Sequence, residues 1–141
     1  MPGRAFFDTN VLIYALAKGD LRSRKAEELL AKGGVLSVQV LNEFVSVARR
    51  KILMSWSEVN EALGAIRVLC PSPLPLTVDT HEAALKIAEE QGYGIYDSLV
   101  VATALEAGCE TLYSEDLQDG QTINGQVTIR NPFAPCSGYK S

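Results

Sequence analysis

The stretch Arg-Ala-Phe-Phe-Asp-Thr-Asn-Val-Leu-Ile-Tyr-Ala-Leu-Ala, residues 4–17, joins a short apolar run to a helix-like segment through one aspartate. Residues 4–7 predict a β-strand, and residues 10–17 predict the helix that follows it. Asp8 stands directly after the strand, at its carboxyl end. In open α/β sheets ligands bind outside the carboxyl ends of the strands, so this order favours an α/β fold with a site near Asp8.

The same alternation of short strands and amphipathic helices continues along the chain. Ser57 is the expected N-cap of one helix, and the last strand is expected at the sheet edge. We expect one domain over residues 1–141, a three-layer α/β sandwich whose mostly parallel sheet has four to five strands and helices on both faces. Further helices are predicted at residues 21–32, 38–51, 57–69, 79–91 and 97–107, and further strands at 35–37, 76–78, 111–113 and 127–130.

The composition excludes several classes of function. No apolar run approaches the roughly 20 residues that cross a bilayer, and the first residues do not resemble a secretory signal, so we expect a cytoplasmic protein. The cysteines Cys70, Cys109 and Cys136 are odd in number and form no CxxC pair, which disfavours a disulfide framework or a zinc site. The only histidine, His81, is expected on a helix surface, so imidazole catalysis is not predicted.

Four acids are expected at the carboxyl edge of the sheet. Asp8 and Asp116 follow strands, Glu43 lies in the first turns of a helix, and Asp97 begins an apolar helix. Asp8 and Asp97 have a simpler interpretation as helix caps, and Asp116 as a turn residue. Glu43 nevertheless shares a helical stripe with valines, and an unpaired carboxylate on a core-facing stripe is costly.

Carboxylates gathered at one edge need a counter-charge. Two of them about 4 Å apart repel by roughly 4 kcal/mol at an effective dielectric near 20. Oxygen ligands without His or Cys select Mg²⁺ or Mn²⁺, and such an ion can activate a water for phosphodiester hydrolysis. The net charge of −4 is weak evidence against a nucleic-acid substrate, because the acids outside this cluster are about balanced by the 13 basic residues.

The segments that carry these acids resemble the PIN-domain ribonucleases of the VapC kind, the toxins of toxin–antitoxin pairs. The resemblance extends from the first strand to the last. The matching segments are Phe7-Asp8-Thr9-Asn10-Val11-Leu12, Ser37-Val38-Gln39-Val40-Leu41-Asn42-Glu43-Phe44, Ile95-Tyr96-Asp97-Ser98-Leu99-Val100-Val101-Ala102, Leu112-Tyr113-Ser114-Glu115-Asp116-Leu117-Gln118-Asp119-Gly120 and Ile129-Arg130-Asn131-Pro132-Phe133.

The resemblance implies that Asp8, Glu43, Asp97 and Asp116 are the catalytic, metal-binding acids, with Asp119 a less certain fifth ligand. It also implies an endoribonuclease that uses Mg²⁺ or Mn²⁺, an RNA substrate, a cognate antitoxin and a homodimer. Thr9 and Ser114 are candidates to hold a carboxylate or a water, and local turn bonds explain them equally well.

Two basic clusters, residues 22–25 and 49–51, are candidates for holding the RNA backbone. Arg49, Arg50 and Lys51 also complement the negative end of their helix, which favours a solvated face. Trp56 and the tyrosines show no regular stacking pattern and are assigned to packing.

Two alternatives to a toxin remain open. One is a PIN nuclease of RNA processing or quality control without an antitoxin. The other is an aspartyl-phosphate phosphatase or receiver domain. That chemistry usually has a second acid two residues after the first, where this chain has Asn10.

Overall fold

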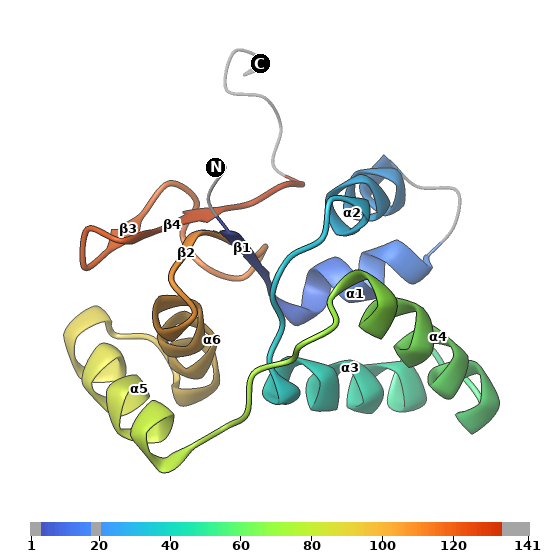
Figure 1. The fold of residues 1–141 in the computed structure, drawn as a ribbon, viewed down its shortest axis with the longest axis horizontal. Helices are drawn as coiled ribbons and strands as arrows, with labels where there is room; N and C mark the ends of the chain where they lie inside the picture. The colour runs from blue at the N-terminus through green and yellow to red at the C-terminus, as the bar shows by residue number, and fades with distance from the viewer. Residues whose placement is uncertain (1–3, 18–20, 134–141) are drawn as a thin grey trace.

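The computed structural model describes residues 4–17 and 21–133 (Figure 1). Within these ranges the chain forms six helices and four strands that alternate only in part along the sequence. The strands are β1 (Arg4–Phe7), β2 (Cys109–Tyr113), β3 (Thr122–Ile123) and β4 (Val127–Arg130), and the helices are α1 (Thr9–Leu16), α2 (Leu21–Ala31), α3 (Val38–Arg50), α4 (Trp56–Leu69), α5 (Val78–Gln91) and α6 (Ile95–Glu106).

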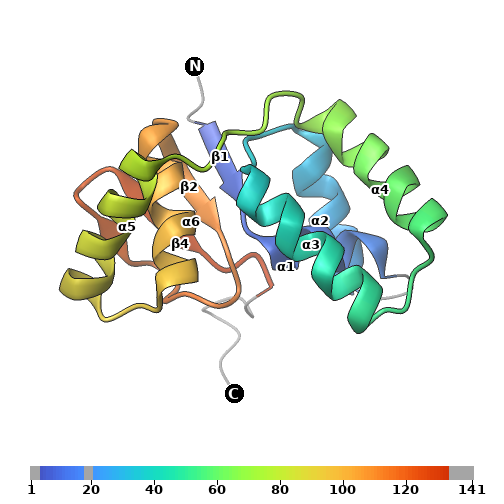
Figure 2. The same cartoon turned by 90° about the horizontal axis from the view of Figure 1, so that it is seen from below.

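The four strands form one sheet in the order β1-β2-β4-β3. β1 pairs with β2 and β2 with β4 in parallel, while β3 pairs with β4 in antiparallel orientation. Helices α5 and α6 lie on one side of the sheet and α1 to α4 on the other (Figures 1 and 2). The predicted α/β architecture, with a mostly parallel sheet between helices, is therefore confirmed.

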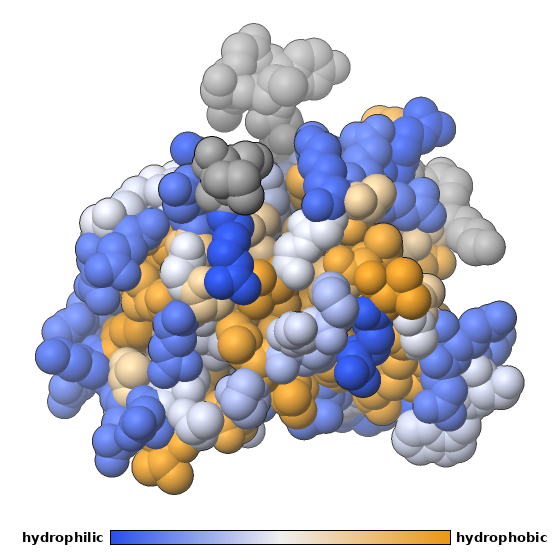
Figure 3. All heavy atoms as spheres, viewed as in Figure 1, coloured by the Kyte–Doolittle hydropathy of each residue, from blue (hydrophilic) through white to orange (hydrophobic). Residues whose placement is uncertain are grey.

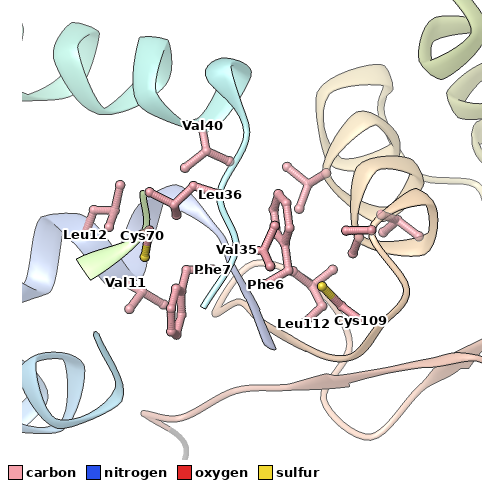
Figure 4. Packing of buried hydrophobic residues seen from close by; sticks show 14 of the residues in the cluster. Phe6, Phe7, Val11, Leu12, Val35, Leu36, Val40, Cys70, Cys109 and Leu112 are labelled. Atoms are coloured by element: carbon pink, nitrogen blue, oxygen red, sulfur yellow. The ribbon is translucent and has the colours of Figure 1, made fainter. Parts of the chain in front are cut away.

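Alternation along β1 divides the apolar core between the two sides. Phe6 and Phe7 are both almost fully buried, and they point to opposite sides of the strand (Figure 4). Phe6 faces α6 with Leu112, and Phe7 faces the helices α1 to α4, near Val11. This double burial explains why β1 is a continuous apolar run. Because β1 is held on both faces, the residue that follows it, Asp8, is fixed at the carboxyl end of the strand.

Two predicted strands are reduced to single bridges. Residues 35–37 make only the parallel bridges Phe6 to Val35 and Ser37 to Leu74, so no full strand forms there. The strand predicted at residues 76–78 is wrong, because the bridge lies at Leu74 and Val78 already begins α5. Prolines on both sides of Leu74 have no amide to donate, which keeps this segment from extending the ladder.

Other boundaries also differ from the prediction. The N-cap of α4 is Ser55 and not Ser57, because Ser55 and Glu58 form a reciprocal capping box around the first turn. The segment β4 is not at the edge of the sheet. The short β3 occupies that position, and two residues give too little periodicity to be found in the sequence.

Cys70 and Cys109 are buried free thiols, and Cys136 lies outside the described residues. Among the residues that the structure describes, no helix combines the length and the apolar character that a membrane crossing requires.

Candidate active site

A pocket of about 450 Å³ opens at the carboxyl ends of β1 and β2. Its walls come from the start and middle of α1, one stripe of α3, the first turn of α6 and the loop after β2. The four acids predicted to share a site, on Asp8, Glu43, Asp97 and Asp116, all line it. The remaining lining residues are Thr9, Asn10, Ile13, Tyr14, Ser46, Val47, Arg50 and Glu115.

Asp8 is the most buried of the four acids, with 4% of its surface exposed. It is the N-cap of α1, and its Oδ1 accepts the amide N–H of Thr9 at 2.7 Å. Its other oxygen, Oδ2, accepts the hydroxyl of Ser114 at 2.7 Å. Burial raises the pKa of Asp8 from 3.8 to about 6, although both hydrogen bonds lower it. The capping interpretation of Asp8 is thus correct, and the cap also faces the pocket.

Ser114 connects the two acids that follow strands. It is fully buried, its hydroxyl donates to Asp8, and the same oxygen accepts the amide N–H of Asp116 at 3.1 Å. The local turn after β2 is therefore capped by Ser114, and the Asp116 side chain is left to face the pocket. Its Oδ2 accepts the side-chain amide of Asn10 at 3.3 Å.

Glu43 reaches the same pocket from α3. Its Oε1 accepts the hydroxyl of Thr9 at 3.0 Å, so Thr9 contacts two acids, one through its amide and one through its side chain. Glu43 lies on the lining stripe with Ser46, Val47 and Arg50, which are spaced at helical intervals of three, four and seven residues.

Asp97 is the third residue of α6 and not its cap, because Gly94 is the N-cap and makes no side-chain bond. Its carboxylate is half-buried and lines the pocket. Burial, followed by repulsion from Asp116, raises the pKa of Asp97. A negative charge in the first turn of a helix is otherwise favourable, so burial and the neighbouring Asp116 outweigh the helix dipole here.

Asp119 does not line the pocket. It is exposed, and its Oδ1 accepts the backbone N–H of Asn131 at 2.8 Å, which ties the loop after β2 to the end of β4. The turn interpretation therefore accounts for the contacts of Asp119, while its role as a ligand stays a prediction.

Sequence reasoning missed the Tyr14–Glu115 pair on the pocket wall. The Tyr14 hydroxyl donates a hydrogen bond to Glu115 Oε1 at 2.9 Å. The same hydroxyl oxygen accepts a hydrogen bond from Nη1 of Arg22 at 3.0 Å. Burial raises the pKa of Tyr14, and Glu115 raises it further. One signal was available, since Tyr14 is one helical turn after Asn10 and Glu115 adjoins Asp116.

The three basic candidates at the end of α3 separate in the structure. Arg50 lines the pocket, and its Nε donates to Ser46 Oγ at 3.2 Å. Arg49 instead lies over the ring of Trp56, 4.4 Å from its centroid. Lys51 is exposed at the end of the helix. The assignment of Trp56 to packing is wrong, because 58% of this residue is exposed.

The donor chemistry of the pocket fits Mg²⁺ or Mn²⁺. Its acids offer only hard oxygen ligands, and the described lining contains no His or Cys. Among the described residues, no group of three Asp, Glu, His or Cys side chains is already arranged to hold a metal ion. An open carboxylate set suits Mg²⁺, which keeps several waters and takes one or two carboxylates directly.

The fold and the pocket together define an α/β protein with a carboxylate site at the carboxyl edge of its sheet. The chain belongs to the PIN domain family, whose sequence profile matches residues 5–118. No curated protein sequence matches the chain significantly.

Solved structures share the fold. VapC20 of Mycobacterium tuberculosis, described as a toxin that cleaves the sarcin–ricin loop, is 24% identical with a TM-score of 0.64, over 79% of this chain and 89% of its own. A toxin–antitoxin complex from Klebsiella pneumoniae is 22% identical with a TM-score of 0.69, over 92% and 98%. VapBC2 of Rickettsia felis, bound to a promoter DNA fragment, is 20% identical with a TM-score of 0.65, over 90% and 97%.

Proposed function

We propose that this chain is a metal-dependent endoribonuclease and the toxin of a type II toxin–antitoxin pair. The observation that carries the proposal is the set of four carboxylates on Asp8, Glu43, Asp97 and Asp116, which line one pocket from four different segments. Membership of the PIN domain family supports a nuclease, and the fold shared with toxin structures supports a toxin.

In this proposal Asp8, Asp97, Asp116 and Glu43 hold the divalent cation. When bound, the cation supplies positive charge for the phosphodiester and lowers the pKa of a water. Ser114 and Thr9 keep Asp8 and Glu43 in place by donating hydrogen bonds to them. Because these donors bond to the ionised form, they also favour the charge state that a cation requires.

Arg50 is proposed to contact the RNA backbone at the far end of the pocket. Among the described residues that line the pocket, Arg50 is the one with a positively charged side chain. Its guanidinium suits the paired oxygens of a phosphate. Lys51 adds charge at the same helix end, while Arg49 is already engaged with Trp56. No covalent intermediate is proposed, because in this mechanism a water is the attacking group.

The proposed partner is an antitoxin that places a basic side chain in the pocket. An arginine pairs well with two carboxylates at once and would compete with the cation. The complexes from Klebsiella pneumoniae and Rickettsia felis support a protein partner for this fold. A homodimer and a cytoplasmic location stay predictions.

The direct test is cleavage of single-stranded RNA by the purified chain with Mg²⁺, with Mn²⁺ and with a chelator. Cleavage that requires the metal supports the nuclease. Growth arrest on expression of the wild-type chain, relieved by a co-expressed neighbouring antitoxin, supports the toxin role. A chain that cleaves RNA with metal but does not affect growth contradicts the toxin role only. RNA left intact at every metal concentration contradicts the nuclease.

A further inference from the structure

The hairpin between α3 and α4 carries an aromatic side chain that the fold does not bury. Helix α3 ends and α4 begins at this hairpin, at one side of the molecule (Figures 1 and 2). The hairpin lies at the lower right of Figure 3. Trp56, the first residue of α4, is 58% exposed there. It is the only tryptophan in the chain.

Trp56 is held in place although it is exposed. The guanidinium of Arg49 lies over the ring at 4.4 Å from its centroid, and Nη1 of the same side chain donates to the carbonyl of Met54 at 2.8 Å. The Ser55 capping box fixes the first turn of α4. A rigid aromatic ring with one side against a cation loses little conformational freedom on binding a flat partner.

The turn itself favours contact with something outside the chain. Leu53 has a left-handed φ of 63°, which is uncommon for a residue with a side chain, and it is 78% exposed. Ile52 is 43% exposed. The amide of Met54 bonds to the carbonyl of Ala48 at 2.9 Å, so the turn is closed back onto α3. Apolar side chains are thus displayed on a constrained turn instead of folding inward.

The position of this turn relative to the pocket indicates what it contacts. Glu43 and Arg50 lie on one stripe of α3, seven residues or about 10 Å apart along the helix axis. Arg49 is next to Arg50 in the chain and connects it to Trp56. The end of α3 therefore places one arginine in the acidic pocket and the adjacent one against the exposed ring. Positive charge followed by an aromatic platform is the pattern that binds single-stranded nucleic acid.

We propose that Trp56 is a stacking platform for one unpaired nucleobase of the RNA, on the flank of the bond that the pocket cleaves. This inference rests on the proposed nuclease function and adds a substrate subsite to it. Arg50 takes a phosphate at the pocket end, and Arg49 is a positioning residue that orients the ring. Because every base has a flat face, the platform favours unpaired over double-stranded RNA without reading its sequence.

The single tryptophan makes binding directly observable. In metal-free buffer, a single-stranded mixed-sequence oligoribonucleotide is titrated into the Asp97→Asn protein, and Trp56 fluorescence is followed. Stacking quenches this fluorescence and protects it from acrylamide, whereas the same RNA annealed into a duplex leaves both signals almost unchanged. Since no cleavage is needed, the result does not depend on catalysis.

Cleavage kinetics of the wild-type protein with Mg²⁺ supply the second measurement. Trp56→Ala raises KM about tenfold and leaves kcat within twofold, since base stacking on an aromatic ring contributes affinity on this scale. Trp56→Phe, which keeps a ring, recovers most of the affinity. Val78→Ala is the matched control, because Val78 is 71% exposed on α5, away from the hairpin. Circular dichroism verifies that each variant is folded.

Two results overturn the platform. One is unchanged fluorescence on adding single-stranded RNA, together with a Trp56→Ala KM equal to that of wild type, while RNA is still cleaved. The other is fluorescence that changes with protein concentration in the absence of RNA, which assigns the turn to contact between two copies of the chain. Quenching by single-stranded RNA without any metal-dependent cleavage supports the platform and contradicts the proposed nuclease function.

Discussion

Two of the walls of the pocket are built in different ways. On the wall formed by the strand ends, Asp8 is almost fully buried, accepts two hydrogen bonds of 2.7 Å, and has its pKa raised to about 6 by burial. On the α3 wall, Glu43 and Arg50 are opposite charges on one helical stripe, and Arg50 is exposed. The first wall holds charge at a cost in stability. The second presents charge to solvent.

This difference indicates which part of the site needs a metal cation to offset its charge. Buried like charges destabilise a fold unless something compensates them, so the strand-end wall gains most from metal. Arg50, at the end of α3, adds no negative charge to the site and gains little from metal. We expect substitutions on the strand-end wall to change catalysis and metal binding, and those at the end of α3 to change RNA affinity.

The largest effect is expected on removing one carboxylate charge from the strand-end wall or from the first turn of α6. Asp8→Asn and Asp97→Asn each lower metal-dependent RNA cleavage about 10³-fold or more, because several kcal/mol of charge stabilisation depend on the cation that they hold. Glu43→Gln has a comparable effect, because Glu43 is proposed to hold the same cation. Single-turnover cleavage assays measure the loss. His81→Ala is the control, since His81 is exposed on α5, and an inactive His81 variant with an active Asp97 variant contradicts the mechanism.

Metal binding is also expected to stabilise the fold. At a concentration 100 times the dissociation constant, Mg²⁺ or Mn²⁺ adds about 2.7 kcal/mol, which raises Tm by roughly 5–10 °C for a domain of this size. Asp8→Asn abolishes most of this rise. Asp119→Asn retains it, because Asp119 is outside the pocket and bonds to Asn131. Thermal denaturation at neutral pH gives both values, and an equal loss in the two variants would make Asp119 a ligand.

The pH dependence of the metal-free protein tests the cost of burying Asp8. A pKa raised from 3.8 to about 6 means that the folded state binds this proton more tightly than the unfolded chain does. The free energy of unfolding therefore falls as pH rises from about 4 to 6, by about 3 kcal/mol from this group, and then stays level. Asp8→Asn removes that fall. Urea denaturation between pH 4 and 8 compares the two proteins, and parallel curves would show that burial costs Asp8 nothing.

The sequence predicted the fold and the four acids from different kinds of signal. The sheet followed from apolar runs such as Ala5-Phe6-Phe7, and Glu43 stood out as a charge on a stripe with Val40 and Val47. The Leu74 bridge and β3 were missed because both are set by pairing across the fold and leave no local periodicity. The Tyr14–Glu115 bond was missed although both residues lie near predicted site residues, because it joins positions 101 apart in the chain.

A smaller effect is expected from Ser114, which supports the strand-end wall without being a ligand. Ser114→Ala removes the hydroxyl that donates to Asp8 and accepts from the Asp116 amide. We expect metal affinity to fall about tenfold, as is usual when the hydrogen-bond partner of a ligand is lost. Calorimetric metal titration measures it. Ser98→Ala is a matched control, because Ser98 is fully buried and its hydroxyl has no partner among the described residues. An equal loss in both variants would indicate a general packing effect.

The smallest effect is expected on the α3 wall. This prediction distinguishes a specific contact of Arg50 with RNA from attraction of RNA by the overall charge of the chain. Arg50→Ala removes one phosphate contact, so KM rises roughly fivefold, the equivalent of about 1 kcal/mol, while kcat changes less than twofold. The salt dependence of RNA binding weakens by roughly 0.7 in the logarithmic slope, the value for one contact to a single strand. Lys86→Ala lowers the net charge equally, but Lys86 is exposed on α5, on the other side of the sheet.

If the two variants change KM and the slope alike, the chain attracts RNA through its overall charge and the α3 wall has no special contact with it. A loss of kcat in Arg50→Ala as large as that in Asp97→Asn would instead make Arg50 part of the catalytic machinery, and the division between the two walls would fail.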